Sequence, residues 1–181
     1  MKKINIGSQI KRKVYNLGAT ESALCKQLKS QLATLQDTKE KLLNEERNYL
    51  KKKQELLASK KTYENDIANA EARKKETEDR IAGFQKTIKA NNTWLKNHPN
   101  ATPATKKKYA NENKNLKNKI ENNQANIPKW EKIITAKNNN LKNTLDQIKS
   151  TEAALSEVNQ DLSNTNSAIT DKKSQIAKAG C

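Results

Sequence analysis

The 181-residue sequence has very few of the residues that form turns, with four Gly and three Pro. All-β and loop-rich folds need such residues at short intervals, so this scarcity weighs against both. Apolar residues are also few: they make up 33% of the chain, against about 45 to 50% in a soluble globular domain. The composition therefore leaves two options, which are disorder or a long helical assembly.

Residues that carry catalysis or bind metals are nearly absent. His98 is the only histidine, and no acid or nucleophile flanks it at the spacing of a catalytic motif. The four glycines are too scattered for a phosphate-binding loop, and no cluster of His and Cys offers a zinc site. We therefore expect a protein that is not an enzyme and that uses neither a cofactor nor a metal.

Long hydrophobic runs are missing as well. No stretch approaches the roughly 18 apolar residues of a transmembrane helix, and the first ten residues lack the apolar core of a signal peptide. We expect a protein that is cytoplasmic at synthesis or part of a virion or other large assembly. Residues 1–19 combine basic and apolar side chains; a short helix packed on the base of the fold is the expected form, and a membrane-surface anchor is the weaker alternative.

Positive charge is abundant. The chain carries 36 Lys and Arg against 20 Asp and Glu, a formal net charge of +16. Residues 86–142 alone hold 13 Lys and three Glu, interleaved with Trp94, Tyr109 and Trp130. Such a segment is typical of nucleic-acid binding, and it also suits an acidic protein surface. The competing interpretation is codon bias, because Asn, Ile and Lys are all frequent.

A heptad repeat decides between disorder and helix. In the second half of the chain, nine successive positions spaced by seven residues are all Ile or Leu, namely Ile120, Ile127, Ile134, Leu141, Ile148, Leu155, Leu162, Ile169 and Ile176. Such a column indicates a coiled-coil helix that needs a partner. A weaker column of equal length runs through the first half, from Leu28 to Phe84.

The only concentration of helix-breaking residues separates the two columns. Pro99 ends the first helix, and Thr102 before Pro103 has the form of an N-cap and first helical residue. The sequence therefore predicts an all-α fold, a long antiparallel two-helix coiled-coil hairpin that associates into a larger helical bundle. Its expected segments are a basic N-terminal segment at 1–19, a first long helix at 20–97 capped by Thr20, a turn at 98–102, and a second long helix at 103–179 that is kinked near Pro128.

The columns also predict how the two arms align. Paired residues in an antiparallel hairpin have numbers with a constant sum, and 204 and 197 are the sums that bring the two columns together. We choose 204, with 197 as the slip by one heptad. In this register Lys74 lies over Trp130, either in a cation–π contact or with its amine reaching out to solvent. Cys181 then lies near Cys25, so the two can form a disulfide, although an intracellular chain would normally keep them reduced.

Two surfaces are candidate interaction sites. Leucines beside the columns predict an oligomer or partner interface, unless they are surface residues selected for helix propensity; they are Leu43, Leu50, Leu57 and Leu145. A basic docking surface is expected at the turn end, and Trp94 is its only exposed ring because Tyr109 and Trp130 fall on core columns. Its residues are Lys86, Lys89, Trp94, Lys96, Lys106, Lys107, Lys108 and Lys114.

The expected function is that of a non-enzymatic structural or scaffold protein, acting as a spacer or assembly component of a larger complex. Its expected partners are itself or other subunits, with an acidic protein surface or nucleic acid at the turn end. The alternative is a nucleic-acid-binding or packaging protein that uses the basic turn end directly. A membrane partner is not expected.

Overall fold

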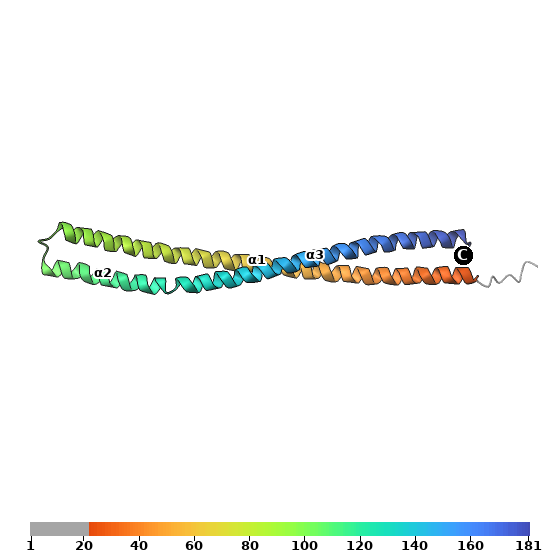
Figure 1. Ribbon diagram of the computed structural model, residues 1–181, viewed down its shortest axis with the longest axis horizontal. Helices are drawn as coiled ribbons and strands as arrows, with labels where there is room; N and C mark the ends of the chain where they lie inside the picture. The colour runs from red at the N-terminus through yellow and green to blue at the C-terminus, as the bar shows by residue number, and fades with distance from the viewer. Residues whose placement is uncertain (1–21) are drawn as a thin grey trace, which may run out of the picture. The chain divides into compact units, whose positions relative to one another are not determined.

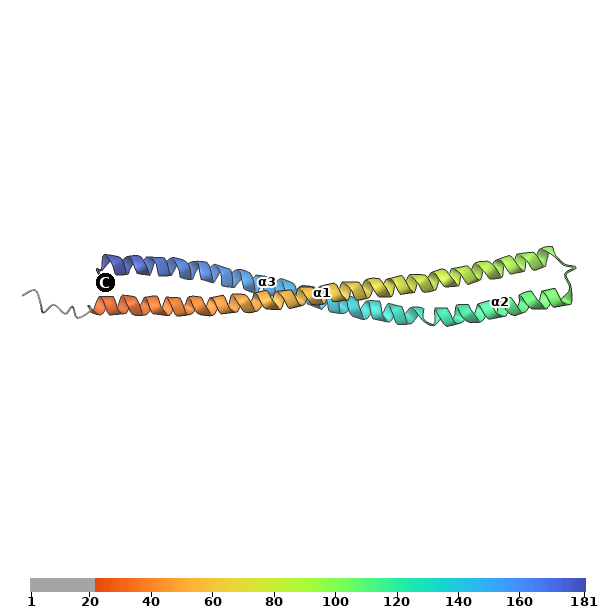
Figure 2. The same cartoon turned by 180° about the vertical axis from the view of Figure 1, so that it is seen from behind.

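The computed structural model describes residues 22–181. The predictions for the segment 1–19 and for a cap at Thr20 lie outside the described residues. The secondary structure of the described residues is helical throughout: α1 (Ala23–Asn97), α2 (Pro103–Gln124) and α3 (Ile127–Lys178). α2 and α3 run alongside α1 in the opposite direction (Figures 1 and 2). The predicted all-α antiparallel hairpin is confirmed, whereas its association into a larger bundle remains a prediction.

The described chain divides into two compact units. The base unit consists of residues 22–51 with Glu152–Cys181, and the turn unit is Lys52–Thr151. In each unit a part of α1 packs against the returning arm of the hairpin. None of the helices within residues 22–181 combines the length and the apolar character needed to cross a membrane.

The first helix begins slightly later than expected. Ser22 precedes α1, and its Oγ accepts a hydrogen bond from the backbone N–H of Cys25 at 3.1 Å. Because a side chain that accepts from the N3 amide satisfies one of the unpaired donors of the first turn, Ser22 is the N-cap. The predicted first helix at 20–97 is corrected to Ala23–Asn97, a single helix of 75 residues.

The turn occupies residues 98–102, as predicted. Thr102 is the N-cap of α2, since its Oγ1 accepts a hydrogen bond from the Thr105 N–H at 3.2 Å, and Pro103 occupies the first helical position. The Lys106 amine donates to the Pro99 carbonyl at 2.7 Å and closes the turn from the other side. The polar side chains of the turn therefore satisfy backbone groups that the helix ends leave unpaired.

The second arm is two helices and not one kinked helix at 103–179. A short turn at residues 125–126 separates α2 from α3, which ends at Lys178. Pro128 is the second residue of α3, where a missing N–H costs little because the first helical amides have no acceptor within the helix. The heptad phase continues across this break. Contacts on its two sides, Lys74 with Glu131 and Asn91 with Asn113, have sums of 205 and 204.

The predicted register is confirmed in both units. In the turn unit, Asn91 Nδ2 donates to Asn113 Oδ1 at 2.9 Å. In the base unit, the Lys172 amine donates to Gln31 Oε1 at 2.9 Å. The sums of these pairs, 204 and 203, lie within one residue of the predicted constant. The slip to 197 would separate each pair by about 10 Å along the helix axis, so the structure excludes it.

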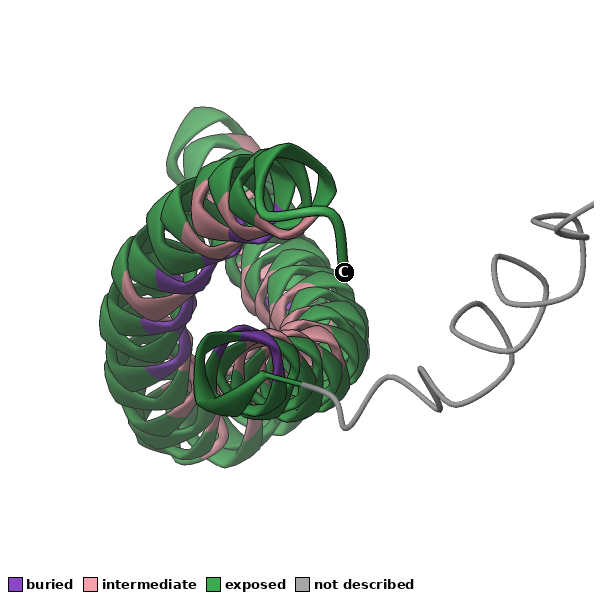
Figure 3. Ribbon diagram, turned by 90° about the vertical axis from the view of Figure 1, so that its right-hand side faces the viewer, coloured by how far each residue is buried: buried purple, intermediate pink, exposed green. Residues whose placement is uncertain are grey.

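The core is a narrow seam between the arms. Buried and intermediate positions lie along the sides of the helices that face each other, and exposed positions face outward (Figure 3). Several of the buried positions are polar, namely Thr77, Asn91, Thr144 and Thr151. The buried apolar residues are Cys25, Leu28, Ala70, Ile81, Ile148, Val158, Leu162 and Ile169. The stability of the hairpin therefore depends on many small layers of side chains that repeat along the seam.

Candidate interaction surfaces

An exposed leucine pair marks one side of the turn unit. The residue exposures are 44% for Leu57 and 43% for Leu145. Leu57 adjoins Leu56, which pairs in the 204 register with the buried Ile148, and Leu145 precedes Ile148 by one helical turn. With the column from Leu28 to Phe84 at heptad position d and the column from Ile120 to Ile176 at position a, both leucines occupy position e. In an antiparallel pair the e positions of the two helices flank the same side of the seam. We call Leu57 and Leu145 the leucine patch.

The other two predicted interface leucines lie in the base unit. Leu50 is 43% exposed, whereas Leu43 is half-buried. Leu24 and Ile133 were not predicted as interface residues, although they are 56% and 39% exposed. Ile133 follows the same rule as Leu57, since it is an apolar residue adjacent to a core column. Its heptad position g, however, places it on the side of the seam opposite the leucine patch.

Lysines of α1 gather on one side of the turn end. Lys89 and Lys96 line a shallow groove together with Asn92. Asn92 Oδ1 accepts a hydrogen bond from Asn113 Nδ2 of α2 at 2.9 Å. The groove therefore lies on the side of the seam where the Asn113 side chain of α2 contacts α1.

Lysines of α2 flank the same side. Lys107 and Lys114 occupy heptad position b, as do Lys89 and Lys96 of α1, and Lys117 occupies position e. Lys89 with Lys114, and Lys96 with Lys107, both sum to 203. Each pair is thus level along the hairpin to within about 1.5 Å, and the two pairs stand about 10 Å apart. We call these five residues the lysine face.

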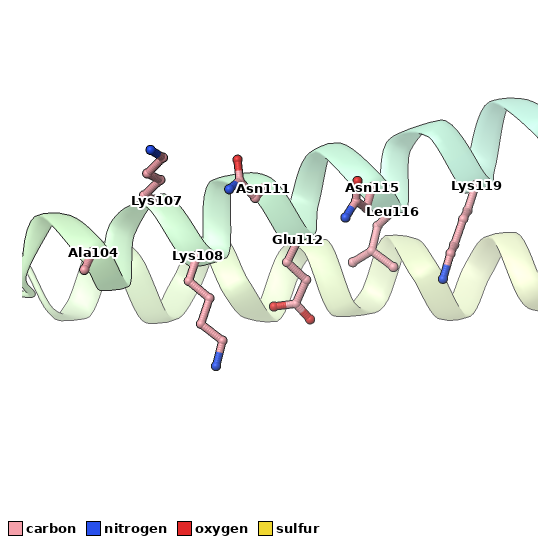
Figure 4. Close-up of a pocket in the computed structure, with 8 residues that line it drawn as sticks. All are labelled: Ala104, Lys107, Lys108, Asn111, Glu112, Asn115, Leu116 and Lys119. Carbon is pink, nitrogen blue, oxygen red and sulfur yellow. The ribbon is translucent and has the colours of Figure 1, made fainter.

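A different side of α2 carries the remaining lysines of the turn end. In Figure 4, Lys107 is directed away from Lys108, Glu112 and Lys119, although all four line one shallow pocket. The Lys119 amine lies 5.8 Å from the centre of the Phe84 ring. Glu112 is the only acidic residue within 86–120. Glu112 thus lies on another side than the lysine face, and Glu121, at position b four residues beyond Lys117, follows the face along α2.

The structure thus divides the eight residues predicted for the basic docking surface. By heptad position, Lys89, Lys96, Lys107 and Lys114 lie on one side of the hairpin, and Lys89 and Lys96 line one groove. Lys86, at heptad position f, points away from the seam, and Lys108 lies on the other side. The Lys106 amine is engaged by the Pro99 carbonyl. Lys117 belongs to the face but was not predicted, although its heptad position would have indicated it.

Trp94 is half-buried, not the exposed ring that the sequence suggested. The His98 ring stacks on it with centroids 4.2 Å apart, and the Tyr109 ring lies 4.7 Å away. His98 Nδ1 is also 2.8 Å from the Trp94 carbonyl oxygen. These three rings close the turn end from within, so Trp94 offers little free surface for a ligand.

The Lys74 side chain reaches outward from the seam. Of its two predicted arrangements, a cation–π contact with Trp130 or an amine that reaches toward solvent, it adopts the second. Its amine lies 2.8 Å from Glu131 Oε1 and 3.8 Å from Glu78 Oε1. The hydrogen bond to Glu131 is the main cause that raises the pKa of Lys74. The cation over the Trp130 ring is instead Arg73, whose guanidinium carbon is 5.6 Å from the ring centre. Trp130 Nε1 is buried without a hydrogen-bond partner.

A second ion pair crosses the seam of the turn unit. The Lys137 amine lies 2.7 Å from Asp66 Oδ2, and it is 5.5 Å from the centre of the Tyr63 ring. The hydrogen bond to Asp66 raises the pKa of Lys137. Both partners are partly exposed, with side-chain exposures of 34% and 37%. The pair therefore links the arms at the edge of the seam.

A disulfide closes the base unit. It joins Cys181 to Cys25 in the first turn of α1, with a Cα–Cα distance of 5.6 Å. Cys25 is buried, at 7% exposure. The two cysteines that the register placed near each other are thus bonded in the structure.

Within residues 22–181, no three His, Cys, Asp or Glu side chains are grouped so that they could hold a metal ion. Comparisons with protein-family models, with curated proteins and with solved structures found no match.

Proposed function

We propose that this protein is a non-enzymatic structural component, a helical spacer or scaffold, and that it associates with a second copy of itself through the leucine patch. The observation that supports the proposal is the exposure of Leu57 and Leu145, at 44% and 43%, on one side of a single layer. The apolar stripe of the hairpin is therefore wider than the surface that one partner arm covers, and such an uncovered stripe is typical of helices that pack against further helices.

A second copy is the occupant that best fits this patch. In a two-fold contact the same surface meets itself, so two copies would bring four leucines together. The neighbouring b positions carry Lys61, Lys142 and Lys149, which outnumber Glu64 at the next e position of α1 and repel their counterparts in such a contact. Association is thus apolar in origin and opposed by charge. Because salt screens the repulsion, association strengthens as the ionic strength rises.

Light scattering coupled to size-exclusion chromatography tests the proposal. At low and at high salt, the wild-type mass should exceed that of one chain, and the oligomeric fraction should grow with salt. The double variant L57Q/L145Q should be monomeric with unchanged helicity. The control I133Q removes an apolar residue that is 39% exposed on the other side and should keep the wild-type mass. A monomeric wild type at both salt concentrations, or an unchanged mass of L57Q/L145Q, would overturn the proposal.

The structural role also agrees with the state of His98. Its ring stacks on Trp94 and its Nδ1 faces a backbone carbonyl, so the histidine serves the turn.

A further inference from the structure

We propose that the lysine face, formed by Lys89, Lys96, Lys107, Lys114 and Lys117, binds the phosphate backbone of duplex nucleic acid without reading its sequence. This inference goes beyond the proposed scaffold role, which uses the leucine patch. It rests on three features of the face: its charge, the polar groups between its lysines, and the side chains that it lacks.

The charge of the face is of one sign. Residues 86–120 contain nine Lys and a single acid, Glu112. Glu112 lies on the other side of α2 (Figure 4), and the one carboxylate that follows the face along α2 is Glu121, at position b four residues beyond Lys117. A concentrated field of this kind attracts polyanions and accelerates their association.

The spacing of the lysines suits an extended anion. Two level pairs, one lysine from each arm, stand about 10 Å apart along the hairpin. Duplex nucleic acid presents about one phosphate charge per 1.7 Å of its axis, so several lysines can contact phosphates at once. Beside Lys89 and Lys96, the groove is lined by Gln85, Asn92 and Thr93. Their amide and hydroxyl groups can donate to phosphate oxygens.

The side chains that are missing argue against an acidic protein as the partner. Protein interfaces are centred on apolar or aromatic anchors that fill pockets of the partner. The exposed large apolar side chains of residues 22–181 are Leu24, Leu50, Leu57, Ile133 and Leu145, and none of them lies at the turn end. The lysine face thus has the charge for binding phosphate but no anchor for a protein.

The face also lacks the groups that read bases. Residues 86–142 contain no Arg, the residue that most often contacts guanine edges. Trp94 is half-buried beside the His98 and Tyr109 rings, so little of its ring is left on which a base could stack. Binding should therefore be electrostatic and indifferent to sequence, and a duplex should bind at least as well as a single strand.

Fluorescence anisotropy with the nuclease-treated full chain tests the proposal. The probes are a labelled random-sequence DNA duplex and a single strand of the same length. If all five lysines contact phosphates, the logarithm of the affinity falls with the logarithm of the salt concentration with a slope of about −4.5, which is roughly a 500-fold loss between about 50 and 200 mM. Absence of duplex binding at the lower salt, or binding of the single strand alone, would overturn the proposal.

Two charge-matched variants test the location. The variant K89Q/K96Q/K107Q/K114Q should reduce the magnitude of the salt slope by about 3 to 4, because four phosphate contacts are lost. The control K86Q/K108Q/K129Q/K132Q removes the same charge from exposed positions off the face. The face variant should bind at least tenfold more weakly than the control, with circular dichroism showing that both remain helical. Equal losses in the two variants would mean that the charge acts diffusely and would overturn the proposal.

Two further measurements complete the test. Lysine acetylation of the wild-type chain, read by mass spectrometry, should be slowed by bound duplex at the lysine face and not at Lys86 or Lys108. Vesicles that contain phosphatidylserine serve as the second source of phosphate, and binding to vesicles without binding to duplex would overturn the proposal. The variant L57Q/L145Q should bind duplex as the wild type does. Duplex binding is thereby tested independently of self-association through the leucine patch.

Discussion

Asn91 and Asn113 form a polar layer across the seam, with Asn91 Nδ2 donating to Asn113 Oδ1 at 2.9 Å. Asn91 is only 8% exposed, and Asn113 Nδ2 donates in turn to Asn92 Oδ1. A slip by one heptad would place Asn91 opposite Lys106 and Asn113 opposite Phe84, leaving buried amides without partners. The layer therefore favours one alignment of the arms, as buried Asn residues do in other coiled coils.

This layer predicts opposite effects of single and double substitution. N113A leaves the Asn91 amide buried without its acceptor and should lower the free energy of unfolding by about 1 to 3 kcal/mol. N91L/N113L replaces the whole layer with apolar side chains and should be neutral or stabilising. Urea denaturation followed by circular dichroism measures both. A double variant less stable than N113A would show that the amide pair itself contributes net stability.

Leucines of the base unit differ in exposure, so their substitution by Ala should lower the free energy of unfolding by different amounts. Leu162 is 8% exposed, whereas Leu50 is 43% exposed. L162A should cost about 2 to 5 kcal/mol in unfolding free energy, because it opens a cavity in the seam. L50A should cost well under about 1 kcal/mol in the monomer, as surface substitutions do. Denaturant titration of both variants under identical conditions provides the comparison, and equal costs would contradict the position of the seam.

The disulfide predicts a strong effect of reduction on stability. Cys25 and Cys181 are 156 residues apart in sequence. Removal of the bond restores the entropy of a long loop to the unfolded chain, so reduction should lower the free energy of unfolding by about 3 to 5 kcal/mol. Thermal unfolding with and without a reductant measures the change. The variant C25S/C181S should not respond to the reductant, and an unresponsive wild type would show that the bond does not form in solution.

The position of Pro128 predicts a small effect of its replacement. A proline inside a helix costs about 3 kcal/mol, but Pro128 lies in the first turn of α3, just after the turn at 125–126. P128A should therefore change the free energy of unfolding by less than about 1 kcal/mol, since the helix end already accommodates the ring. Chemical denaturation measures the change, and a stabilisation near 3 kcal/mol would show that the ring strains a continuous helix.

The ion pair of Lys137 with Asp66 predicts a pH dependence. The hydrogen bond to Asp66 raises the pKa of Lys137 above its ordinary 10.5. A group whose pKa is raised by folding stabilises the fold below its unfolded pKa, and this contribution is lost as the pH rises through the folded value. The stability difference between wild type and K137Q should thus be constant near neutral pH and disappear at strongly alkaline pH. K132Q, at an exposed position of the same helix, is the control and should show a smaller difference at neutral pH.

Much of the fold could be predicted because a heptad column records which side of a helix is buried. The column from Ile120 to Ile176 identified the second arm, and its match with the first column predicted the 204 register that Asn91 and Asn113 obey. The start of α3 could not be read in this way. Pro128 indicates a local disturbance, but whether the helix bends or restarts depends on the backbone of the residues before it.

The lysine face was predicted less well, because the number of lysines in a segment does not show to which side of the helix each lysine points. Lys107 and Lys108 are neighbours in sequence yet point to different sides of α2 (Figure 4). Heptad positions would have separated them. The place of Trp94 depends on the His98 and Tyr109 rings, which come from the turn and from the opposite arm. Such contacts between rings lie outside the heptad pattern, so the core columns, which include Tyr109 and Trp130 but not Trp94, predicted Trp94 to be exposed.

The bond between Cys25 and Cys181 also has a mechanical consequence. It turns the chain from Cys25 to Cys181 into a covalent ring that contains both arms and the turn. A force that pulls the ends of the two arms apart at the base would be carried by the sulfur atoms. The apolar layers of the seam would then bear little of that load and could not be unzipped one after another. Under reducing conditions the same force would act on the Leu28 layer first and open the hairpin from its base.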